Sequence, residues 1–168
     1  MGALRLLLAG AALAVGVAGP ARAAGADEEA LAAAIQTLAA GYEYRGQIYG
    51  AEVVNDVAFE PRQGLLLIGI DDAEETAPLT LMIPLRTVAI DPVLGRFRDT
   101  GKPAIVMSCR PACIESVPGR LEEAMRRLSA GSGAAGSLKP REQYALGCRP
   151  ELCESMQNVL DELVAMDE

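Results

Sequence analysis

Apolar and polar positions follow two different periods along the chain, and each period predicts an element. From Asp27 to Gly41 apolar side chains recur every three or four positions, which is typical of a helix. Residues 51–60 and 79–85 alternate between apolar and polar, as half-buried strands do, and residues 65–70 form a continuous apolar run typical of a more central strand. Residues 105–109 alternate again. These segments predict an antiparallel sheet that follows an N-terminal helix.

The parity of the apolar positions changes close to Arg86. Leu85 belongs to the alternation that precedes it, whereas Val88 and Ile90 take the opposite parity. A bulge or tight bend near Arg86 would keep both sets facing the core. Pro84 predicts an edge position or a bulge for this strand, because proline has no backbone N–H for a central ladder.

The last third of the chain contains a pattern that occurs twice. Each copy has a strand ending in Cys-Arg-Pro, a second cysteine, a Glu-Ser pair and an amphipathic helix, the first near residues 119–129 and the second at 150–165. A stretch rich in Gly, Ser and Ala at 130–138 predicts a flexible loop between them. The pattern indicates an old duplication, with chance similarity as the alternative.

Together these segments predict an α+β domain, in which an amphipathic C-terminal helix packs on an antiparallel sheet and an additional helix lies near 119–129. A bent run at 79–90 and a final strand at 143–148 closed by the helix at 150–165 resemble the layout of pleckstrin-homology-like domains. The resemblance implies a bent sheet plugged by the C-terminal helix, and a role in binding lipids, peptides or proteins rather than in catalysis. The helix near 119–129 would be an insertion in that plan.

The first residues carry the features of a secretory signal peptide. Arg5 precedes an uncharged apolar run at 6–19, and Pro20 precedes the small-residue triplet at 21–23. The run is shorter than the roughly 20 residues that span a bilayer, so we expect residues 1–23 to be cleaved, with a retained anchor as the alternative. The remaining residues 24–168 fit one domain in an exported protein, periplasmic or secreted.

Charge and composition exclude several classes of partner. The whole chain has a net charge of −8, and cleavage after residue 23 would remove two arginines and make it more negative. Such a surface repels nucleic acid and anionic lipid, so we expect neither as a partner and no stable membrane span after cleavage. The chain also lacks a phosphate-binding glycine motif, and we expect no cofactor.

Four cysteines give the strongest chemical prediction, and they are Cys109, Cys113, Cys148 and Cys153. In an exported protein an even number of cysteines predicts disulfides. Two local bridges, each enclosing an Arg-Pro turn, are favoured over bridges between the two copies, such as one from Cys109 to Cys148. A four-thiolate zinc site and a redox site are the alternatives, although the two-residue spacing of thioredoxin-like sites is absent.

The chain contains no histidine, which removes Ser-His-Asp and Cys-His mechanisms. An acidic cluster at Asp71, Asp72, Glu74 and Glu75 is interpreted as a solvated loop, with weak calcium binding or carboxylate catalysis as alternatives. Five basic residues are candidates for an anion or partner site if the two copies lie side by side: Arg96, Arg98, Lys102, Arg110 and Arg149.

These observations favour an exported, non-catalytic binding or accessory domain that acts through protein contacts. The first alternative is a small-molecule or lipid-binding domain with an apolar pocket between the sheet and the terminal helix. The second alternative is an enzyme based on carboxylates or thiols.

Overall fold

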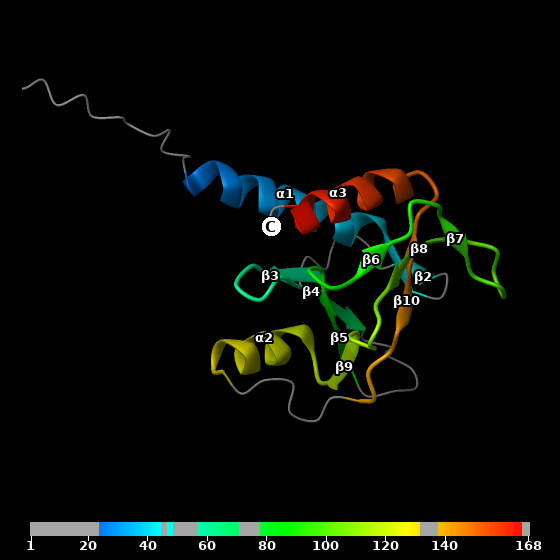
Figure 1. Ribbon diagram of the computed structural model, residues 1–168. Helices are drawn as coiled ribbons and strands as arrows, with labels where there is room; N and C mark the ends of the chain where they lie inside the picture. The colour runs from blue at the N-terminus through cyan, green and yellow to red at the C-terminus, as the bar shows by residue number, and fades with distance from the viewer. Residues whose placement is uncertain (1–23, 45–46, 49–56, 71–77, 132–137, 166–168) are drawn as a thin grey trace, which may run out of the picture.

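The computed structural model describes residues 24–44, 47–48, 57–70, 78–131 and 138–165. Within these ranges the chain forms three helices and two antiparallel sheets, which confirms the predicted α+β class (Figure 1). The predicted signal peptide, the acidic cluster and most of the predicted loop at 130–138 lie outside the described residues, as does the start of the strand predicted at 51–60.

The smaller sheet has four strands in the order β3, β4, β5 and β9. Their bounds are Val57–Glu60, Leu65–Ile70, Leu79–Pro84 and Glu115–Pro118. All residues of β4 are buried, because both faces of this sheet are covered. Leu66 and Ile68 face the main core, whereas Leu65 and Leu67 belong to a second core under helix α2, Leu121–Ser129. The continuous apolar run predicted this burial.

The larger sheet has six strands, of which β2, β1, β10, β8 and β6 follow one another and β7 also pairs with β8. Their bounds, in chain order from β1, are Tyr42–Tyr44, Gln47–Ile48, Ala89–Ile90, Gly95–Arg96, Pro103–Ser108 and Gln143–Cys148. A bridge between Ile114 and Arg141 joins the segment before β9 to the segment before β10. The two sheets therefore meet at this corner without closing a barrel within the described residues.

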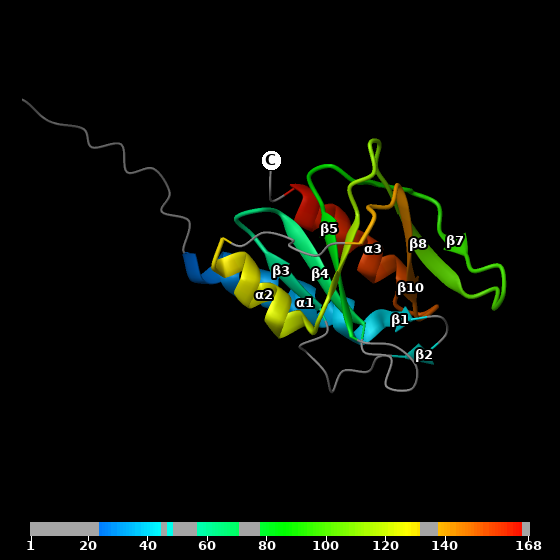
Figure 2. The ribbon, with the colours of Figure 1, turned by 90° about the horizontal axis from the view of Figure 1, so that it is seen from below.

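Helices α1, Ala24–Gly41, and α3, Cys153–Ala165, lie side by side on the main core (Figures 1 and 2). Helix α2 lies on the opposite face of the smaller sheet, where Leu121, Ala124 and Leu128 are buried. Its acidic residues stand in the first turn and its basic residues in the last, as the helix dipole favours. The additional helix predicted near 119–129 is thereby confirmed.

The change of parity near Arg86 marks the passage from one sheet to the other. Strand β5 ends at Pro84, a turn follows, and β6 then joins the larger sheet, with Leu85 and Val88 both buried. The prediction of a tight bend is confirmed, but β5 lies between β4 and β9 and is not an edge strand. Pro84 is tolerated because β9 pairs only with Leu79 to Met82 and stops before the proline.

Candidate functional site

The two disulfides connect Cys109 with Cys113 and Cys148 with Cys153, with Cα–Cα distances of 6.0 and 5.1 Å. Local pairing is thus confirmed over pairing between the two copies. Because every cysteine sulfur is bonded to another, none is a thiolate that could ligate zinc.

The directions of the strands separate the two Arg-Pro loops. Strands β8 and β10 are neighbours but antiparallel, with Ser108 opposite Gln143 and Ala104 opposite Gly147. The loop that follows β8 therefore lies at one end of the larger sheet and the loop that follows β10 at the other. The two copies do lie side by side, yet Arg110 and Arg149 are not brought together. Each arginine follows the C-terminal end of its strand, and in antiparallel strands these ends lie at opposite edges of the sheet.

The other basic residues belong to the end of the sheet opposite to Arg110. Arg96 donates to the carbonyl oxygen of Gly101 at 2.9 Å within the β7–β8 hairpin, and Arg98 is exposed in the same hairpin. Lys102 Nζ lies 3.5 Å from Glu43 Oε2. The five candidates consequently do not form one anion site.

Glu43 is a buried charge that the sequence did not single out. Its side chain is only 4% exposed, on β1 beside β10, and Lys102, with a side chain 40% exposed, is its ion-pair partner. A buried carboxylate that loses its cation keeps its desolvation cost without the compensating attraction. The pair therefore anchors the β7–β8 hairpin to β1.

Replacing this cation (Lys102→Met) is expected to lower the free energy of unfolding by about 1–2 kcal/mol, less than for a fully buried pair because Lys102 is partly hydrated. Urea unfolding followed by circular dichroism measures the change. The matched control Lys139→Met, at an exposed lysine, should stay within about 0.5 kcal/mol of the wild type. Equal effects of the two substitutions would show that the Glu43 pair is energetically silent.

An open groove of about 420 Å³ lies at the other end of the larger sheet, and we call it the Cys109 groove. Its lining residues come from the ends of β6, β8 and β10 and from the segments beside them: Thr87, Ala89, Ser108, Cys109, Arg110, Glu142 and Gln143. Ala89 and Gln143 both stand opposite Ser108 in the strand register. Three neighbouring strands thus form the floor of the groove.

Charge in the Cys109 groove is exposed and only loosely paired. Arg110 Nε lies 4.0 Å from Glu142 Oε2, and the two side chains are 90% and 64% exposed. Exposed pairs of this kind contribute little to stability, so both groups are accessible for contact with another molecule. Arg110 was a candidate from the sequence, whereas Glu142 and Thr87 were not, because only the strand register brings them to the same groove.

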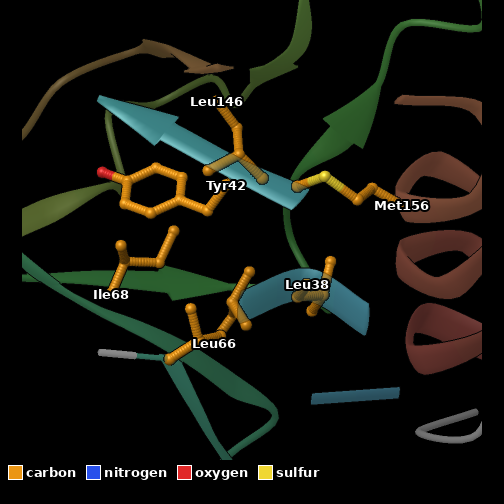
Figure 3. Close-up of a pocket in the computed structure, with 7 residues that line it drawn as sticks. Leu38, Tyr42, Leu66, Ile68, Leu146 and Met156 are labelled. Carbon is orange, nitrogen blue, oxygen red and sulfur yellow. The ribbon is translucent and has the colours of Figure 1, made fainter. Parts of the chain in front are cut away.

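The space between sheet and terminal helix, where a lipid or small-molecule pocket was the alternative, is filled by side chains. Leu38, Tyr42, Leu66, Ile68, Leu146 and Met156 converge there from α1, β1, β4, β10 and α3 (Figure 3). The volume between these side chains that a water molecule could occupy is approximately 0 Å³. The described side chains therefore leave no water-sized space at this point of the core.

Comparison with known proteins found no family model, no curated protein and no solved structure that matches the chain. Within the described residues, no helix combines the length and apolarity needed to cross a bilayer. A functional proposal therefore rests on the chemistry of the site.

Proposed function

We propose that the chain is an exported, non-catalytic binding domain that contacts another protein through the Cys109 groove. The observation that carries the proposal is the groove itself, an open recess on the ends of three strands with an exposed arginine and an exposed carboxylate at its rim. Binding sites for small molecules are lined mainly by apolar and aromatic groups, whereas none of the described residues that line this groove is aromatic. A polar or charged segment of a protein suits it better.

Export is the second part of the proposal. The order of charged, apolar and small residues in the first 23 positions favours a cleaved signal peptide, and the two disulfides fit an oxidising compartment. The pleckstrin-homology-like layout remains a prediction that agrees with a binding role. In that family the fold presents a surface and performs no chemistry.

A photo-crosslinking residue at position 108 in the groove tests the contact in the exported fraction of the host. We expect a discrete crosslinked partner from this position and none from position 99, which is exposed in the β7–β8 hairpin at the other end of β8. Charge reversal at the rim (Arg110→Glu) should lower the yield about tenfold or more, because arginine contacts often dominate an interface.

The matched charge reversal Arg98→Glu, outside the groove, should leave the crosslinking yield unchanged. Equal loss in both variants, or no partner from position 108, would contradict a specific contact at this groove.

A further inference from the structure

We propose that the Cys109–Cys113 disulfide is a thiol–disulfide exchange site, which reacts with external thiols while the Cys148–Cys153 disulfide stays intact in the folded protein. This inference goes beyond the proposed protein contact and does not depend on it, because small thiols need no docking surface. It rests on the different burial of the two disulfides, on the groups that contact the sulfurs and on backbone bonds around the loop.

The two disulfides differ in access to solvent. Cys148 and Cys153 are 0% and 1% exposed, and both belong to the main core. Cys113 is half-buried. Cys109 is only 5% exposed and also belongs to the main core, but it lines the Cys109 groove. An external thiolate can therefore approach the first disulfide in the native state, whereas the second requires the core to open.

Hydrogen-bond donors contact both sulfurs of the accessible disulfide. The backbone N–H of Cys113 donates to Cys109 Sγ at 3.0 Å. The exposed Thr87 hydroxyl lies 3.4 Å from Cys113 Sγ and shares its one proton with the Pro84 carbonyl oxygen at 3.1 Å. The carbonyl oxygen of Arg141 lies farther from Cys109 Sγ, at 3.8 Å. Arg110 is the next residue in the chain and lines the same groove. The amide donor stabilises negative charge on Cys109 Sγ when this sulfur leaves, and a cation in the same groove adds to that effect, less strongly because Arg110 is exposed and lies beside Glu142.

These contacts assign the direction of exchange. An external thiolate attacks Cys113 Sγ, which belongs to the more exposed residue, and forms a mixed disulfide there. The Cys109–Cys113 bond breaks, and its electron pair goes to Cys109 Sγ as a thiolate. A second thiolate of an external dithiol then attacks the external sulfur of the mixed disulfide and releases Cys113. Two electrons thereby reduce the protein disulfide, and the dithiol is oxidised to a cyclic disulfide.

The loop that contains this disulfide is also held by the backbone. Cys109 N–H donates to the carbonyl oxygen of Glu142 at 2.8 Å, and Ile114 and Arg141 exchange N–H to carbonyl bonds of 3.2 and 2.9 Å. Both ends of the loop therefore stay attached to the segment before β10 when the bridge opens. Because the enclosed loop is small, opening the bridge returns little entropy to the unfolded chain and costs little stability, so the reduced protein should remain folded.

Graded reduction by dithiothreitol, followed by alkylation and peptide mass spectrometry, tests the inference on the folded protein. We expect Cys109 and Cys113 to be alkylated about 100-fold faster or more than Cys148 and Cys153, since buried groups react only through unfolding. Far-UV circular dichroism should stay native after the first reduction. Equal rates, or faster reduction of Cys148–Cys153, would overturn the proposal.

Two further measurements test the assigned direction. With glutathione as a monothiol, the trapped adduct should be on Cys113, and an adduct on Cys109 would show the opposite direction of attack. The variant Arg110→Ala should slow reduction several-fold, whereas Arg98→Ala in the β7–β8 hairpin should not change the rate. Because both arginines are exposed, both variants should fold, and equal rates in the two would remove Arg110 from the exchange step.

Discussion

An alanine in place of Gly147 (Gly147→Ala) is expected to destabilise the protein by about 4 kcal/mol or more, enough to prevent stable folding in a domain of ordinary stability. The Cβ atom would lie 2.0 Å from the backbone carbonyl oxygen of Glu43 and 3.1 Å from the Phe97 ring. A backbone carbonyl in a paired strand cannot move aside in the way that the end of a flexible side chain can. Since Glu43 pairs with Gly147 across β1 and β10, the clash would separate these strands. Urea unfolding and the soluble yield measure the effect.

The control for Gly147 is the same substitution at Gly101. Gly101 has a φ of +69°, but beyond its two chain neighbours no atom of the described residues lies within 4 Å of the added Cβ. Only backbone strain remains, and we expect a cost of about 1 kcal/mol. If Gly147→Ala lowered the free energy of unfolding no more than Gly101→Ala does, the backbones of β1 and β10 would not approach each other as closely as described.

Truncation of Leu160 (Leu160→Ala) should lower the free energy of unfolding by about 2–5 kcal/mol. The side chain is fully buried in the main core, on the face of α3 that also buries Met156 and Leu163. Leucine and alanine are both good helix formers, so the loss reports packing and not helix propensity. Chemical denaturation with circular dichroism detection gives the value.

The matched truncation Leu138→Ala removes the same atoms from a side chain that is 47% exposed. It should cost less than about 1 kcal/mol, because little apolar surface returns to water. Similar losses at positions 138 and 160 would mean that α3 does not cover the core as described.

Most of the elements that the sequence predicted are long enough to show a period or lie in a longer periodic run. Six or more residues are found in each of α1, α2, α3, β4, β5, β8 and β10. At this length the spacing of apolar residues shows whether an element buries one face or both. Strands β3 and β6 contain only four and two residues but lie in the predicted runs at 51–60 and 79–90, whereas the equally short β1, β2, β7 and β9 were not predicted. Such short segments have no measurable period, and their pairing partners decide their structure.

The candidate site was predictable only where it depends on local sequence. The Arg-Pro turn between each pair of cysteines favoured local disulfides, and this was confirmed. The Cys109 groove depends instead on which strands are neighbours and in which direction they run. Nothing in the sequence placed Glu142 beside Arg110, because the β8–β10 register alone brings these residues together.

The pairing of β1 with β10 also determines which parts of the protein can fold before synthesis of the chain is finished. Tyr42, near the beginning of the folded part, finds its partner Cys148 about 100 residues later. Closing so long a loop costs entropy before the contact is gained, so this pairing forms late. The pairing of β1 cannot form before β10 has been synthesised, and the main core cannot be completed before α3 has followed it. Under the proposed export route, the larger sheet and the main core are therefore completed only after nearly the whole chain has emerged, whereas the local hairpins of the smaller sheet do not have to wait.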